Sequence, residues 1–156
     1  MGKQRGRGQE ESPPPRQPRP RPIHHRGPVR DIVFAVRDDG SSPAREFLES
    51  LSVSDQDRFN DLFIWMAESG EIRNTEKFRF NVGKATCKVG NRSQTVPIAE
   101  FKIHAGSGQR IMAFLHGRQW VLTHGFRKGE NLSVQKKRAN QIICEDLAGQ
   151  SAPERT

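Results

Sequence analysis

The chain has only two cysteines and no long apolar run. These two features argue against a disulfide-rich, metal-binding or membrane-spanning protein. Cys87 and Cys144 are too few for a disulfide framework or a metal-ligand set, so we expect two free thiols in a reducing compartment. No apolar stretch approaches the length that spans a bilayer. The N-terminus has no apolar signal core, and glycine at position 6 breaks the myristoylation pattern. These features predict a cytoplasmic protein without a membrane partner.

Charge is present in excess, but it is unevenly distributed along the chain. The formal net charge is +8 over 156 residues, of which only 33% are hydrophobic. Residues 31–75 hold ten acids and four bases, whereas residues 102–138 hold eight bases and one acid. One domain with polar tails fits this composition. The basic second half predicts an anionic partner, with nucleic acid the first candidate.

The N-terminal segment is rich in proline and arginine and almost free of apolar side chains. It includes the run SPPPRQPRPRP, which cannot form a helix and has nothing to bury. We therefore expect residues 1–28 to be a disordered basic arm, followed by a domain over residues 29–148 and a polar tail over 149–156. The arm either tethers the protein electrostatically to RNA or the ribosome, or is an incidental extension.

The domain itself shows both strand and helix patterns. RDIVFAVRDDG predicts a strand, and start signals at Ser42-Pro43 and at Ser54 predict two consecutive helices that end at Gly70. Residues 71–97 have no clear pattern, and KVGNRSQTV fits a mobile insertion. IAEFKIH, QRIMAFLH and RQWVLTHGF predict a three-stranded antiparallel meander, followed by a basic helix over residues 133–147. This is an α+β domain with helices on one face of a small antiparallel sheet.

The turn between the last two strands gathers cations at one end of the meander. If Gly117-Arg118 is a two-residue turn, Ile111 pairs with His124 and Arg110 lies opposite Gly125. A four-residue AGSG loop would pair His104 with Gln109, and a shift of one residue would turn Lys102 to the other face. The side chains expected to gather there are Lys102, His104, Arg110, His124, Arg127 and Lys128, with Lys136, Lys137 and Arg138 approaching from the helix.

Cations beside a histidine suit phosphodiester chemistry. Fixed Arg and Lys groups stabilise the extra negative charge of a phosphorane transition state. RNA carries its own nucleophile, the 2′-hydroxyl, so the enzyme needs only a base, an acid and cationic clamps, and no metal or cofactor. The alternative interpretation remains open. Lysines and arginines at strand edges also serve solubility, Glu100 would pair with Lys102 or Arg110, and His124 would be a structural residue.

Three stretches together resemble a known family. IAEFKIH, QRIMAFLHGRQWVLTHGFRKG and the Ser-led helix SVQKKRANQI are similar to the RelE/ParE toxin superfamily, especially its phage-derived HigB-like branch. The resemblance covers residues 29–147. It implies a RelE-like fold, with the N-terminal strand and helical hairpin packed on the sheet. It also implies the toxin of a toxin–antitoxin pair, which cleaves mRNA on the ribosome without metal and leaves a 2′,3′-cyclic phosphate.

The resemblance also implies partners and site residues. The partners are a cognate antitoxin of helix-turn-helix type, the ribosome and mRNA. Arg110 and Lys128 correspond to phosphate clamps, Lys102 to a base or electrostatic stabiliser, and His124 to a structural or acid–base residue. Arg127, His104, Lys136, Lys137 and Arg138 would contact RNA. The chain has no tyrosine, although many relatives use a C-terminal one. This departure leaves an alternative open: a non-catalytic or gyrase-type inhibitory binding protein of the same fold.

Overall fold

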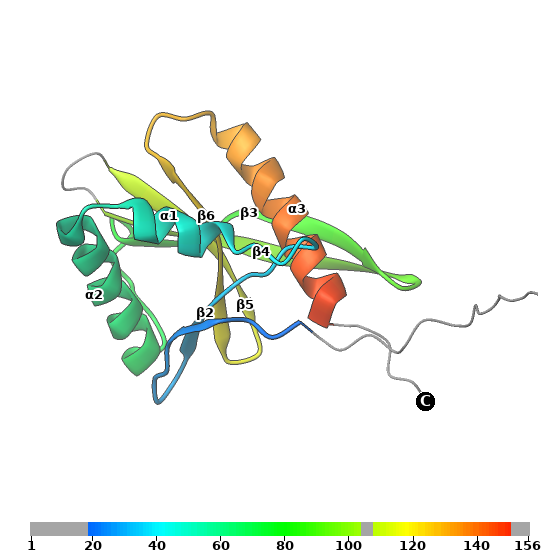
Figure 1. The fold of residues 1–156 in the computed structure, drawn as a ribbon, viewed down its shortest axis with the longest axis horizontal. Helices are drawn as coiled ribbons and strands as arrows, with labels where there is room; N and C mark the ends of the chain where they lie inside the picture. The colour runs from blue at the N-terminus through cyan, green and yellow to red at the C-terminus, as the bar shows by residue number, and fades with distance from the viewer. Residues whose placement is uncertain (1–18, 104–107, 151–156) are drawn as a thin grey trace, which may run out of the picture.

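In the described part of the chain, two strands are followed by two helices, four further strands and a last helix. The structure, a computed structural model, describes residues 19–103 and 108–150. Its elements, shown in Figure 1, are β1 (Ile23–His25), β2 (Asp31–Phe34), α1 (Pro43–Ser50), α2 (Val53–Ser69), β3 (Phe78–Val89), β4 (Arg92–Lys102), β5 (Gln109–His116), β6 (Gln119–Arg127) and α3 (Leu132–Gln150). The predicted α+β class is confirmed.

All six strands of this part of the chain belong to one sheet, in the order β1-β2-β6-β5-β4-β3. β2 runs parallel to β6, with Ile32 beside Trp120, and the other neighbours are antiparallel. The expectation of a small, purely antiparallel sheet is therefore wrong. Two consecutive helices separate β2 from the meander, and this long connection allows β2 to enter the sheet parallel to its last strand.

Helices cover both faces of the sheet. On one face Phe59 and Phe63 of α2 pack with Phe101 and Trp120, and α1 contributes Leu48 to the same core. On the other face Ile142 and Ile143 of α3 pack against the opposite sides of the strands. Figure 1 shows α2 and α3 separated by the strands. The prediction that helices cover only one face is wrong, because α3 crosses to the second face and closes a second core there.

The two consecutive helices begin and end on local signals. Pro43 is the first residue of α1, as the sequence predicts. Helix α2 begins two residues earlier than expected, because its N-cap is Ser52 and not Ser54. The hydroxyl of Ser52 accepts a hydrogen bond from the amide N–H of Asp55. Gly70 ends α2 in the left-handed conformation that glycine adopts without strain.

The segment without a clear sequence pattern forms a long β-hairpin. Strands β3 and β4 pair from Val89 with Arg92 back to Phe78 with Phe101, so KVGNRSQTV is part of the hairpin and not an insertion. The pairing is interrupted between Arg79 and Gly83. Asn81 lies in this bulge with a φ of 69°. Bulges twist a strand and redirect its side chains, which explains why alternation is hard to read in this stretch.

The folded part begins before Val29. Strand β1 pairs with β2, and the side chain of Arg21 donates to Asp146 of α3 at 2.6 Å. Both side chains of this pair are almost fully buried. The predicted arm therefore extends too far, because residues 19–28 belong to the fold; residues 1–18 lie outside the described part. At the other end α3 continues to Gln150, into the segment predicted as a tail.

The two cysteines form a disulfide that joins β3 to α3. Cys87 and Cys144 are 57 residues apart in sequence and meet where α3 packs on the sheet. The prediction of two free thiols is wrong, because a count of cysteines does not reveal that the two side chains converge on one core. Within the described residues, none of the helices has the length and apolar character that crossing a bilayer demands.

Candidate functional site: a buried glutamate among four cations

A β-bulge sets the register of the β5–β6 hairpin. Leu115 pairs with Trp120 and Ala113 with Leu122, as the turn at Gly117-Arg118 predicts. Beyond that point Thr123 is an extra residue, its hydroxyl donates to the carbonyl of Met112, and Met112 then lies opposite His124. The predicted pairs of Ile111 with His124 and of Arg110 with Gly125 are therefore wrong. Arg110 lies opposite Phe126.

The neighbouring pair of strands brings three charged residues together. Lys102 of β4 lies directly opposite Arg110 of β5, and Glu100 lies two residues earlier on the same face. Arg79 of β3 is the partner of Glu100 on its other side. This register is one residue away from the one that would pair His104 with Gln109. His104 itself lies outside the described residues.

Glu100 is the centre of this arrangement. Only 8% of the residue is exposed, and its Oε2 lies 3.9 Å from Nε of Arg110, which is too far for a hydrogen bond. Burial raises the pKa of the Glu100 carboxyl, and the surrounding positive charges, with Arg110 the strongest, oppose that rise. The four cations that act on it are Arg110, Lys102, Arg79 and Lys136. We call Glu100 and these four residues the cationic cluster.

The cations of the cluster are themselves perturbed. Burial lowers the pKa of the Lys102 ammonium, Glu100 opposes this effect, and the positive charges of Arg110 and Arg79 add to it. Nη1 of Arg110 is buried and has no hydrogen-bond partner within the described residues. Arg110 therefore has an unpaired N–H donor inside the cluster, and Lys102 holds its proton less tightly than an ordinary lysine.

Of the three basic residues predicted on the last helix, one reaches the cluster. The aliphatic chain of Lys136 lies over Gly83 of β3, where a Cβ would come within 3.2 Å of its Cδ. Glycine at this bulge thus makes room for Lys136 to extend toward Glu100. Lys137 and Arg138 are exposed on α3. Arg138 acts electrostatically on His124.

The cations after the histidine divide between the two faces of the sheet. The backbone N–H of Lys128 donates to the carbonyl of Gly108 at 2.9 Å, and its side chain lies beside that glycine. Alternation along the strand puts Lys128 on the face of Arg110, at the rim of the cluster. Arg127 is opposite Gln109 on the other face, where it is exposed.

His124 is a buried structural residue. Its Nε2 lies 2.9 Å from Oε1 of Gln135 in α3, and its Nδ1 lies 3.2 Å from the hydroxyl of Thr123. Only 1% of the residue is exposed, and burial lowers its pKa to about 4. The imidazole is therefore neutral and out of contact with any ligand at the surface. Of the two roles predicted for His124, this placement fits the structural one, and it does not fit a catalytic residue.

The glycine that follows has a packing role too. A Cβ on Gly125 would overlap the ring of Phe47 in α1, so glycine lets α1 approach β6 on one face. Phe126 packs on the other face, in the core beneath α3. The run His124–Phe126 thus anchors a helix on each side of the sheet.

Sequence reasoning found Lys102, Arg110 and Lys136 but missed Arg79 and the central position of Glu100. Arg79 stands between Phe78 and Phe80, and that alternation was the available signal for a strand. The cluster has a base candidate, an acid candidate and anion-binding donors. Within the described residues no group of three or more potential metal-binding side chains occurs. Comparison of this chain with family models, curated proteins and solved structures finds no match.

Proposed function

We propose that the protein is an endoribonuclease whose active site is the cationic cluster. The observation that carries the proposal is the burial of Glu100 among four cations. A carboxylate with a raised pKa is better matched to proton abstraction near neutral pH than an ordinary glutamate. Cations fixed around it stabilise the charge that develops on a phosphorane. A surface arrangement for solubility would not place a glutamate in the core.

The proposed reaction is an internal transesterification of RNA. Glu100 removes the proton of a 2′-hydroxyl, and the 2′-oxygen attacks the adjacent phosphorus. The bond from phosphorus to the 5′-oxygen breaks, and Lys102 donates a proton to that oxygen. The products are a 2′,3′-cyclic phosphate and a free 5′-hydroxyl. Arg79, Arg110 and Lys136 offset the charge on the non-bridging oxygens, and Lys128 holds the strand at the rim.

The biological setting we propose follows from the family resemblance. The chain would be a RelE/HigB-like toxin that acts in the cytoplasm on mRNA bound to the ribosome and is held inactive by an antitoxin of helix-turn-helix type. The two consecutive helices, the meander and the basic helix are consistent with that fold. The strongly basic β4–β6 region would suit binding to ribosomal RNA as well as to the substrate.

Mapping of RNA ends after induced expression tests the function. Wild-type protein should arrest growth and create new mRNA 5′ ends that carry hydroxyl groups. Arg110→Ala should reduce cleavage by about a hundredfold, the usual loss when one donor to a transition-state anion is removed. Arg92→Ala is the matched control, because it removes one arginine charge from an exposed position at the tip of the β3–β4 hairpin, outside the cluster. Growth arrest with intact mRNA would contradict the proposal and favour inhibition by binding.

A further inference from the structure

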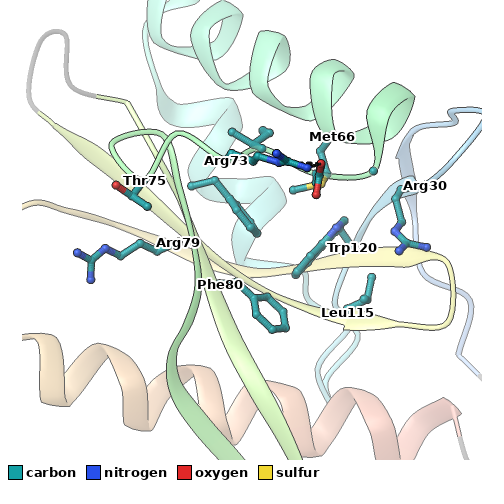
Figure 2. Close-up of a pocket in the computed structure, with 12 residues that line it drawn as sticks. Arg30, Met66, Arg73, Thr75, Arg79, Phe80, Leu115 and Trp120 are labelled. Carbon is teal, nitrogen blue, oxygen red and sulfur yellow. Dashed lines mark hydrogen bonds and ion pairs between the residues drawn. The ribbon is translucent and has the colours of Figure 1, made fainter.

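A cavity lies on the face of the sheet opposite the core under α3. The cavity has a volume of about 610 Å³ and lies between the segment after α2, the start of β3 and the β5–β6 hairpin. Figure 2 shows Trp120 at its centre, with Phe80 and Leu115 below it and Arg73 above. None of the residues that the sequence predicts for phosphate binding lines this cavity, but Arg79 of the cationic cluster does.

The walls of the cavity are aromatic. The rings of Phe78 and Trp120 meet edge to face at 5.3 Å, and the ring of Phe80 lies 6.0 Å from Trp120. Phe80 is 55% exposed, which is unusual for so large an apolar side chain. The bulge interrupts the pairing of β3 after Arg79, so Phe80 lies within it, next to Asn81. The chain therefore holds an exposed ring beside the cavity, where a flat ligand could stack.

The polar groups of the cavity are donors and positive charges. The buried Nε1 of Trp120 and Nε of Arg30 have no hydrogen-bond partner in the described part of the chain. Three arginines, Arg30, Arg73 and Arg79, line the cavity. Its one acidic residue, Glu71, pairs with Arg73 at 2.9 Å. The complementary ligand is flat, rich in acceptors and anionic, and a nucleotide has all three properties.

We propose that this cavity binds one nucleotide of an RNA strand that passes around β3, the edge strand of the sheet, from the cationic cluster on the other face. The base stacks on Phe80 and offers an acceptor to Nε1 of Trp120, and its phosphate lies on Arg79. In Figure 2 the side chain of Arg79 extends from β3 away from the aromatic rings. A phosphate bound to Arg79 would therefore lie farther from Trp120 than the stacked base does. This inference rests on the proposed function, because Arg79 also belongs to the cationic cluster around Glu100.

Tryptophan fluorescence of the full chain tests the pocket without any cleavage step. The protein has two tryptophans, so Trp65→Phe leaves Trp120 as the only reporter, and Trp65 does not line this cavity. Uridine and adenosine 5′-monophosphates should cause a saturable change, whereas ribose 5-phosphate, which has no base, should bind at least tenfold more weakly. Base stacking on an aromatic side chain contributes about 1–3 kcal/mol, so loss of the ring should weaken binding by about 5- to 150-fold.

Variants at the exposed ring make the test specific. In the Trp65→Phe background, Phe80→Ala and Phe80→Leu should both lose that affinity, because leucine keeps apolar bulk but not the flat ring. Phe80→Trp should retain it. No saturable change with millimolar nucleotide would overturn the inference, and so would equal binding of ribose 5-phosphate or unchanged binding by Phe80→Leu. Nucleotide binding without RNA cleavage would instead remove the proposed nuclease function and leave a nucleotide pocket. Cleavage without nucleotide binding would remove only the pocket.

Discussion

Oε2 of Glu100 lies 3.9 Å from Nε of Arg110 across two neighbouring strands, and about a tenth of each side chain is exposed. At this distance Arg110 acts on the carboxylate through its charge and not through a hydrogen bond. Burial raises the pKa of Glu100, and Arg110 is the largest of the charges that lower it. The pair therefore sets how readily Glu100 accepts a proton.

Removal of the Arg110 charge should raise the pKa of Glu100 further. Arg110→Met keeps an apolar stem in the same place but removes the cation that stabilises the ionised carboxylate. The ¹³C chemical shift of the Glu100 carboxyl, followed through a pH titration, should show a higher midpoint in Arg110→Met than in the wild type. As the pH is lowered, residual RNA cleavage should be lost at a higher pH in the variant than in the wild type, because Glu100 acts as a base only when it is ionised.

Lys137→Met is the control for that titration, since it removes an equal charge from outside the cluster. It should leave the Glu100 midpoint where it is in the wild type. An unchanged or lower midpoint in Arg110→Met would show that Arg110 does not act on Glu100, and it would remove the electrostatic basis of the proposed site.

His124 should make stability depend on pH in acid. Its pKa in the folded protein is about 4, below the 6.5 of an unperturbed histidine. A depressed pKa contributes stability that is fully present above the unfolded value and is lost as pH falls through the folded value. At about 1.4 kcal/mol for each pKa unit, the loss between pH 6.5 and pH 4 is about 3 kcal/mol. Urea unfolding across this range should show it.

His124→Gln should flatten that pH dependence, because glutamine cannot take up a proton but can still bond to Gln135. Its RNA cleavage at neutral pH should stay within a fewfold of the wild type, since the imidazole is buried and does not contact substrate. Loss of RNA cleavage in a folded His124→Gln protein would contradict the structural role and support a catalytic one.

The buried pair of Arg21 and Asp146 should be essential to stability. Asp146 accepts from the guanidinium of Arg21 and from the backbone N–H of Val36, with its side chain fully buried. Asp146→Ala would leave Arg21 buried without its carboxylate partner, which costs about 3–5 kcal/mol. Asp38→Ala is the control, because the exposed pair of Asp38 with Arg19 should contribute less than about 1 kcal/mol. Chemical denaturation measures both.

The same pair determines where the chain can be shortened. A variant without residues 1–28 would lose strand β1 and Arg21, so lost activity would report misfolding and not a role of the arm. A variant without residues 1–18 keeps both. Unchanged ribosome affinity and activity in that shorter deletion would leave the arm as an incidental extension, whereas weaker ribosome binding would support an electrostatic tether.

Local patterns predicted the elements better than they predicted their assembly. The turn at Gly117-Arg118 and the Pro43 helix start could be read because each depends on a few adjacent residues. The extra residue at Thr123 could not be read from the sequence, because a bulge changes the alternation pattern only once the strands are paired. This bulge determines on which face of the sheet His124 lies. The parallel pairing of β2 with β6 depends on contacts between distant parts of the chain. For the same reason the sequence assigned Lys102 and Arg110 to one site but did not place Arg79 with them.

Reduction of the Cys87–Cys144 disulfide should destabilise the protein and loosen the cationic cluster. The bond closes a loop over a sequence separation of 57 residues, for which the chain-entropy model gives about 4 kcal/mol. It also ties α3, which carries Lys136, to β3, which carries Arg79 and Gly83. Denaturation with and without a thiol reductant, compared with Cys87→Ser/Cys144→Ser, should give that difference in the wild type and none in the double variant.

Cleavage of RNA by the reduced protein should also fall if Lys136 loses its position over Gly83. Equal activity of the reduced and oxidised forms would show that packing of α3 on the sheet holds Lys136 without the bond, and that the proposed site is compatible with a reducing cytoplasm.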